Sequence, residues 1–127
     1  NRTSVWCWGS NSYGALGDGT ATARSAPVQV SGLAKNITDI SVGNRYSCAI
    51  EGTAADGTTG AVACWGYNNY GQVGDGTTTT RYAAVDTGLR DAETVSCAHA
   101  TYPHTCASTL ADELYCWGYN GYCQVGD

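Results

Sequence analysis

The chain has 127 residues, a net charge of −5 and 13% charged residues, while glycine occurs 17 times. This length fits one modest domain, and the abundance of glycine and threonine favours short strands and turns over helices. The acidic balance argues against the basic footprint of nucleic-acid binding. No apolar run approaches the ~20 residues that span a bilayer, so we expect no membrane insertion. Methionine is absent, so we expect a processed or excised product.

Short strands are predicted along the whole chain, and no window has a helical apolar stripe. Apolar side chains alternate with a period of two in several segments, which is typical of strands with one buried face. Asp-Gly turns and polar loops separate these segments. In chain order the expected strands span residues 5–9, 28–30, 38–43, 46–50, 62–66, 93–98, 104–107 and 114–118.

One segment, Trp-Gly-x-Asn-x-Tyr-x-x-x-Gly-Asp, occurs three times and starts at Trp8, Trp65 and Trp117. Recurrence at such a spacing predicts a repeat architecture, not a single-core globule. We therefore divide the chain into the end of a preceding unit (1–18), a first full repeat (19–75) and a second full repeat (76–127).

The repeated segment, a Pro-Val-x-Val strand that starts at Pro27, and Ile-Ser-Val-Gly (40–43) before Tyr-Ser-Cys-Ala (46–49) resemble the RCC1-like repeat family (regulator of chromosome condensation 1). The resemblance covers essentially the whole chain. It implies an all-β fold of four-stranded antiparallel β-propeller blades, of which this chain holds about two to two and a half. Propellers need about 4–8 blades, so the chain does not close a ring on its own. The family includes a nuclear exchange factor for a small GTPase, but the acidic charge and the cysteines point elsewhere.

The seven cysteines look like those of the secreted, mostly bacterial branch of the family, in which Cys-Ala on one strand faces Cys-Trp-Gly on the next. That resemblance pairs Cys48 with Cys64, and Cys106 with Cys116. Directly opposed residues on antiparallel strands lie within the range of a disulfide. Buried free thiols in a reducing compartment are the alternative.

Two cysteines depart from the repeat pattern in the same unit. Cys97 stands where the first repeat has Val42, and Cys123 stands where earlier segments have Gly14 and Gly71. If those glycines adopt positive φ, a cysteine there needs a compensating contact. We therefore predict a Cys97–Cys123 bridge.

A zinc site is the rival hypothesis for this region, from Cys97, His99, His104 and Cys106. Its spacing matches no common zinc motif, so we expect neither a metal nor a cofactor. Cys7 is left without a partner within the chain, which suggests either an intermolecular disulfide or a partner in a stretch of chain outside this sequence.

Surface modification and ligand binding have candidate residues as well. Two sequons make Asn1 and Asn36 candidate sites for N-linked glycans, although such triplets also arise by chance in a threonine-rich sequence. O-linked sugars have a candidate site in the run Thr77, Thr78, Thr79 and Thr80. A carbohydrate- or protein-binding face is expected from the aromatic residues of the repeated segments, although packing within the repeat is the competing role of the tryptophans. These aromatic residues are Tyr67, Tyr70, Tyr119 and Tyr122, beside Trp65 and Trp117.

No sequence motif of catalysis is present, and the two histidines lie in one predicted loop, so we expect no enzyme. The leading hypothesis is an extracellular structural protein that associates with copies of itself into a fibre or surface layer. The alternative is a fragment of a larger secreted propeller that binds proteins or glycans. The expected partners are therefore copies of the chain or the rest of a longer repeat array, with glycans as further candidates.

Overall fold

The computed structural model describes residues 4–34, 36–52 and 60–127, and the described residues form nine β-strands. These residues form no helix. They therefore include no helix that is long enough and apolar enough to span a bilayer. In chain order the strands are β1 (Trp6–Gly9), β2 (Arg24–Gln29), β3 (Ile37–Val42), β4 (Tyr46–Glu51), β5 (Ala61–Gly66), β6 (Arg81–Asp86), β7 (Ala92–Cys97), β8 (His104–Thr109) and β9 (Leu114–Gly118).

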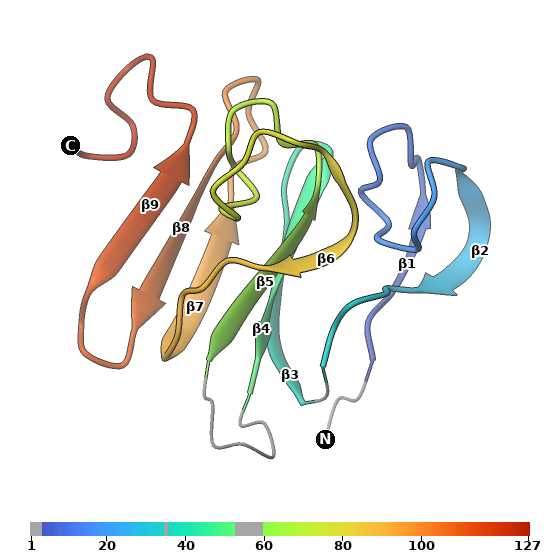
Figure 1. Cartoon of the computed structure of the whole chain (residues 1–127), viewed down its shortest axis with the longest axis horizontal. Coiled ribbons are helices and arrows are strands. Elements are labelled where there is room, and N and C mark those ends of the chain that lie inside the picture. Colours follow the sequence, from blue (N-terminus) through green and yellow to red (C-terminus); the bar gives the residue numbers. More distant parts are fainter. Residues whose placement is uncertain (1–3, 35, 53–59) are drawn as a thin grey trace.

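The strands form three antiparallel sheets that stand side by side like the blades of a fan (Figure 1). The first blade holds β1 and β2, the central blade holds β3-β4-β5-β6, and the third blade holds β7-β8-β9. Within the described residues only the central blade has four strands, and the three sheets do not close into a ring. The expected all-β, antiparallel and unclosed architecture is confirmed.

Each blade is offset by one strand from the sequence repeat. The repeat 19–75 supplies β2 to the first blade and β3 to β5 to the central blade, whose fourth strand, β6, comes from the next repeat. The loop after each Trp-Gly strand therefore carries the chain back along the same sheet. This offset ties neighbouring repeats together through backbone hydrogen bonds within each sheet.

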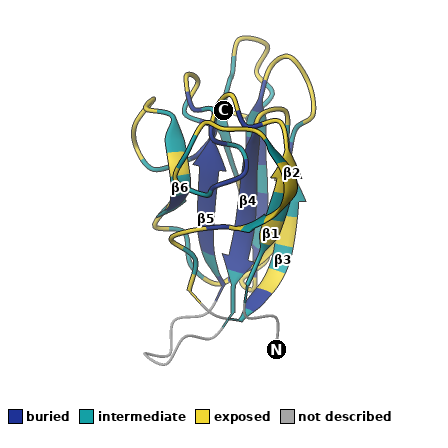
Figure 2. Ribbon diagram, turned by 90° about the vertical axis from the view of Figure 1, so that its right-hand side faces the viewer, coloured by how far each residue is buried: buried dark blue, intermediate teal, exposed yellow. Residues whose placement is uncertain are grey.

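The core consists of two apolar layers, one on either side of the central blade. Strands β4 and β5 are buried over most of their length (Figure 2). Trp65, Ala49 and Ala63 face the first blade, whereas Cys48, Cys64 and Ile50 face the third blade. Alternation along each strand places successive side chains on opposite faces. The central blade is therefore buried on both faces, while each outer blade has only one covered face.

The loop after each Trp-Gly strand is held by one buried asparagine. The Asn11 side chain accepts a hydrogen bond from the Leu16 amide at 2.9 Å and donates to the carbonyls of Thr20 and Thr22 at 3.0 and 3.1 Å. Asn68 makes the same set of bonds in the next loop. An asparagine at this repeat position therefore replaces backbone pairing in a loop that has no strand partner.

An ion pair closes each of the first two loops. The Arg24 guanidinium lies 2.8 Å from Asp18, and the Arg81 guanidinium lies 2.6 Å from Asp75. Burial alone would raise the pKa of Asp18, but hydrogen bonds from Thr20, Arg24 and Asn11 outweigh it and lower the pKa to about 2. The Asp-Gly-Thr sequences thus serve as turns.

Acid should weaken the fold through Asp18. Its pKa is lower in the folded chain than the ~3.9 of a free aspartate, so its stabilising effect is complete above about pH 4 and is lost as the pH falls towards 2. Urea denaturation at several pH values should show that the free energy of unfolding falls over this range. The variant Asp18→Asn should lose less free energy of unfolding between about pH 4 and pH 2 than the unchanged chain. An equal loss in the two proteins would show that Asp18 is not the group responsible.

Candidate functional site

Two disulfides each join neighbouring strands of one blade, one in the central blade and one in the third blade. Cys48 is bonded to Cys64, and Cys106 to Cys116, and in each case the two residues are direct partners across β4–β5 or β8–β9. Both predicted bridges are present. The first is fully buried between two blades, whereas the second faces outward from the third blade.

The predicted Cys97–Cys123 bridge is absent, and this expectation was wrong. Cys97 is a buried free thiol whose amide donates to the Ser41 hydroxyl at 2.9 Å, so its side chain packs against the central blade. Burial raises the pKa of the Cys97 thiol to about 11, so it is protonated and unreactive at neutral pH. Cys123 is an exposed free thiol in the loop after β9, and it does have the positive φ of the glycines that it replaces.

The remaining predicted sites lie apart from one another. Cys106 is committed to its disulfide, so the alternative zinc set loses one ligand. Asn1 lies outside the described residues, and Asn36 is half-buried beside the start of β3. The Thr77 hydroxyl donates to Asp75 at 2.7 Å, and Thr78 and Thr79 of the same run are exposed.

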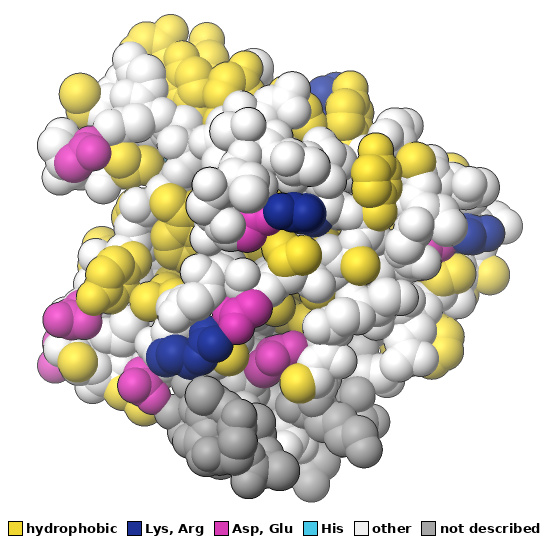
Figure 3. Space-filling view, in the orientation of Figure 1, with side chains coloured by type: hydrophobic (Ala, Val, Ile, Leu, Met, Phe, Trp, Pro, Cys, Tyr) yellow, Lys and Arg dark blue, Asp and Glu magenta, His cyan; other side chains and the backbone are white. Residues whose placement is uncertain are grey.

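A ladder of six tyrosines runs across all three blades. In the orientation of Figure 1 it follows the upper edge, where the loops after β1, β5 and β9 lie, and hydrophobic side chains gather along this edge (Figure 3). Consecutive ring centroids are 4.7 to 6.2 Å apart. We call this set the tyrosine ladder: Tyr13, Tyr67, Tyr70, Tyr119, Tyr102 and Tyr122.

The ladder combines exposed ring surface with hydroxyl groups. Tyr70 and Tyr122 keep 45% and 69% of their surface exposed. Most neighbouring rings meet edge to face, and the Arg45 guanidinium lies 4.8 Å from the centre of the Tyr13 ring. Aromatic faces with a polar tip are suited to stacking and hydrogen bonding with a ligand.

Four of the six ladder tyrosines were predicted from the sequence, and two were missed. Tyr13 occupies the same repeat position as Tyr70 and Tyr122, so the repeat itself held the signal for it. Tyr102 lies in the β7–β8 connection, outside the repeated segment, and no sequence pattern indicates that it stacks on Tyr119.

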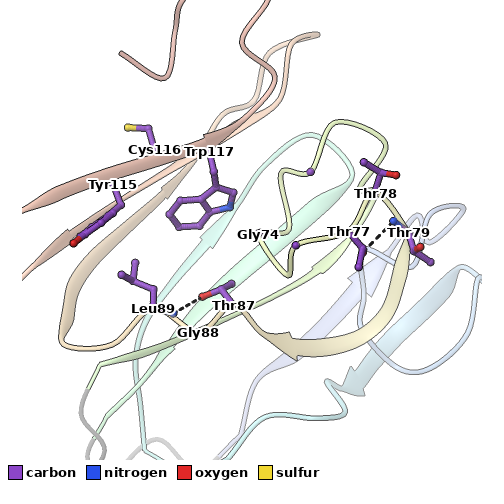
Figure 4. A pocket seen from close by; sticks show the side chains of 12 residues that line it. Gly74, Thr77, Thr78, Thr79, Thr87, Gly88, Leu89, Tyr115, Cys116 and Trp117 are labelled. Atoms are coloured by element: carbon purple, nitrogen blue, oxygen red, sulfur yellow. Dashed lines mark hydrogen bonds between the residues drawn. The ribbon is translucent and has the colours of Figure 1, made fainter. Parts of the chain in front are cut away.

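A second candidate site is a groove of about 1000 Å³ beside β9. We call it the β9 groove; its walls are the segments 71–79 and 87–89, which precede and follow β6, and residues 115–117 of β9. Trp117, Thr87 and Leu89 point into it (Figure 4), and the face drawn in Figure 3 is hollowed on the β9 side. Its lining is apolar and hydroxylic.

The β9 groove has a filled counterpart between the first and central blades. There β6 is the occupant: Ala84 donates its amide to the Ser31 carbonyl at 2.9 Å, and Tyr82 accepts from the Gly19 amide at 2.8 Å. A Cβ on Gly32 would collide with Ala84, whereas one on Gly88, the matching residue of the next repeat, would meet open space. The β9 groove therefore has a shape that can accommodate a further β-strand.

A third feature is a groove of about 620 Å³ beside β1. We call it the β1 groove; it lies between residues 7–16 of the first blade and residues 42–47 of the central blade. Cys7 lines it as a half-buried free thiol. Within the described residues, β1 pairs with β2 alone.

Antiparallel blades that pack face to face, of which the central one has four strands, define a section of a β-propeller. The comparison with known families gives the type of blade. Residues 4–50 match the profile of the regulator of chromosome condensation (RCC1) repeat. This part of the chain is an RCC1 repeat.

Curated relatives align with nearly the whole chain. The human E3 ubiquitin-protein ligase HERC2 is 29% identical over 98% of this chain, and the probable human E3 ubiquitin-protein ligase HERC4 is 30% identical over 98%. The Arabidopsis thaliana ultraviolet-B receptor UVR8 is 28% identical over 96%. The chain spans only 2%, 11% and 27% of the lengths of these relatives, respectively.

Solved structures show the same fold. Prp20p from Saccharomyces cerevisiae superposes with a TM-score of 0.73 at 22% identity, and covers 98% of this chain with 28% of its own. Human WBSCR16 superposes with a TM-score of 0.71 at 17% identity, over 94% of this chain and 29% of its own. At these identities the likeness concerns the fold alone.

Proposed function

We propose that this chain is a section of a larger RCC1-type propeller whose tyrosine ladder binds a protein segment or a glycan. The observation that carries the proposal is the continuity of the ladder, because six rings contact one another across three blades. A binding role, and not a catalytic one, accords with the fold: the binding properties of Prp20p to Gsp1p and histones have been described.

The ladder offers both parts of a recognition surface. Its rings supply apolar area at a low entropic cost because a tyrosine has few rotatable bonds. The exposed rings lie at the ends and in the middle of the ladder, so an extended ligand would contact several blades at once. The buried Asn11 and Asn68 side chains hold the loops after β1 and β5 in place. The tyrosine rings on these loops are therefore positioned before a ligand arrives.

The tyrosine ladder can be tested with two neutral probes, a panel of soluble oligosaccharides and a proline-rich peptide, with binding followed by NMR. The double variant Tyr102→Ala/Tyr122→Ala should weaken binding of a positive probe at least about tenfold, since each lost aromatic contact is worth ~1 kcal/mol or more. The control is Tyr82→Ala, because Tyr82 is as exposed as Tyr102 but lies on β6, outside the ladder. Equal losses in the two variants would contradict the proposal.

Self-association is a second candidate function, favoured by the two open grooves. Unpaired strand edges recruit further strands, and both outer blades have such an edge among the described residues. We extend this to an extracellular structural role, as a subunit of a fibre or surface layer, because the two disulfides fit an oxidising compartment. Compact monomers alone in negative-stain electron micrographs of native material would contradict it.

A further inference from the structure

We propose that the Tyr67 ring binds a proline of a partner protein, and that Arg45 beside it selects an acidic residue next to that proline. This inference rests on the binding function proposed above for the tyrosine ladder, and it names the ligand as an acidic, proline-containing segment in the polyproline II conformation. The site consists of Tyr13, Tyr67, Tyr70 and Arg45, which meet where the first blade packs against the central blade. We call it the Tyr67 site.

Tyr67 is recessed between two exposed rings of the ladder. Tyr13 and Tyr70 keep 37% and 45% of their surface exposed, whereas Tyr67 is half-buried. The Tyr67 ring is inclined at 74° to the Tyr13 ring and at 75° to the Tyr70 ring. Both neighbours therefore meet Tyr67 edge to face, and a ligand ring that reaches Tyr67 would also contact the exposed rings beside it.

The next recessed ring along the ladder shows what can lie on such a site. Tyr102 stacks on Tyr119 with the ring centroids 4.7 Å apart and the planes inclined at 25°. Tyr102 belongs to the β7–β8 connection (98–103), whereas the corresponding β3–β4 connection (43–45) has no aromatic residue. Among the described residues no ring stacks face to face on Tyr67. A ring supplied by a ligand can therefore take the place that Tyr102 takes on Tyr119.

Arg45 gives the Tyr67 site a positive charge. Its side chain is exposed, and its guanidinium lies 4.8 Å from the centre of the Tyr13 ring. The Arg45 carbonyl accepts a hydrogen bond from the Tyr67 amide at 2.8 Å, which fixes the arginine beside the ring. The ion pairs among the described residues involve other arginines and do not include Arg45. Charge complementarity therefore favours a ligand with a carboxylate at this position.

The spacing of the recessed rings fits a polyproline II helix. Two ring-to-ring steps, of 6.2 and 5.1 Å, lead from Tyr67 to Tyr119. The two rings are therefore no more than about 11 Å apart, and one turn of a polyproline II helix, which is three residues, spans ~9 Å. With one proline on Tyr67, a second proline three residues along would reach Tyr102, which covers Tyr119 and is 41% exposed.

Proline is the residue that best combines a flat ring with this spacing. A proline-rich segment adopts the polyproline II conformation before it binds, so little conformational entropy is lost on docking. Its carbonyls have no hydrogen bonds within the helix and are free to accept from tyrosine hydroxyls. The expected ligand therefore has an acidic residue next to one proline and a second proline three residues away.

The test is an NMR titration of the 127-residue chain with synthetic peptides that differ at a single position. Each peptide has proline at every third position, and the residue next to the first proline is aspartate, asparagine or lysine. The aspartate peptide should bind about threefold more tightly than the asparagine peptide, as for a solvent-exposed ion pair, and the lysine peptide should bind most weakly. An aspartate peptide with alanine in place of the prolines should bind at least about tenfold more weakly.

A charge reversal assigns the selectivity to Arg45. The variant Arg45→Glu should prefer the lysine peptide to the aspartate peptide, because the sign of the charge beside Tyr67 is reversed. The control Arg90→Glu makes the same change in net charge at a residue that pairs with Asp86, outside the ladder. This control should keep the preference for aspartate.

The outcomes separate this inference from the proposed function. Proline peptides that bind equally well with aspartate, asparagine or lysine would overturn the inference, as would an unchanged preference in Arg45→Glu. Oligosaccharides that bind the ladder where no proline peptide binds would also overturn it and leave the proposed function standing. If neither peptides nor oligosaccharides bind, the inference and the proposed function both fail.

Discussion

Replacing Trp65 with alanine should destabilise the chain by about 3–5 kcal/mol, the cost typical of a large buried aromatic side chain. Trp65 is fully buried between the first and central blades, and its indole N–H donates to the Ala15 carbonyl at 2.9 Å. The change removes that bond and leaves a cavity beside Val30 and Ala84. Urea denaturation followed by circular dichroism measures the loss.

The repeat supplies matched controls for this prediction. Trp8 holds the same repeat position but is 63% exposed, so Trp8→Ala should change the free energy of unfolding by no more than about 0.5 kcal/mol. Trp117 is half-buried and donates to the Gln72 carbonyl, so its loss should fall between the other two. Equal losses in the free energy of unfolding for Trp8→Ala and Trp65→Ala would show that burial of Trp65 between the blades does not stabilise the fold.

Removing the Cys48–Cys64 disulfide should lower the free energy of unfolding by about 3 kcal/mol, the value for a closed loop of this size. The two residues are 16 apart in sequence and are fully buried between the central and third blades. The double variant Cys48→Ala/Cys64→Ala avoids an unpaired thiol, and its urea midpoint can be compared with that of the oxidised chain.

The second bridge provides the comparison. Cys106 and Cys116 are 10 residues apart and half-buried, so the variant Cys106→Ala/Cys116→Ala should lose less stability than Cys48→Ala/Cys64→Ala. Reductant should shift the midpoint of the unchanged chain in the same direction as the double variants. A midpoint insensitive to reductant would mean that the bridges contribute nothing to the native fold.

Much of the architecture could be predicted because its signals are local. The strand around Cys64 has its period of two, the Trp-Gly segment returns in register, and each bridge joins residues on consecutive strands. The error at Cys97 has a physical cause as well. The sequence places Cys97 on a strand but does not say which neighbour its side chain meets, and Ser41 and Tyr46 of another blade bury it.

The sequence by itself predicted the repeat and every strand except β6, and the family resemblance predicted the two disulfides. Each of these features depends on residues that are close along the chain or equivalent between repeats. Only the tertiary structure decided which blade faces are covered and that Tyr102 joins the tyrosine ladder. It also decided that β6 fills the groove between the first and central blades, while the corresponding β9 groove is open. These features depend on how one blade is placed against the next, and no local pattern encodes that placement.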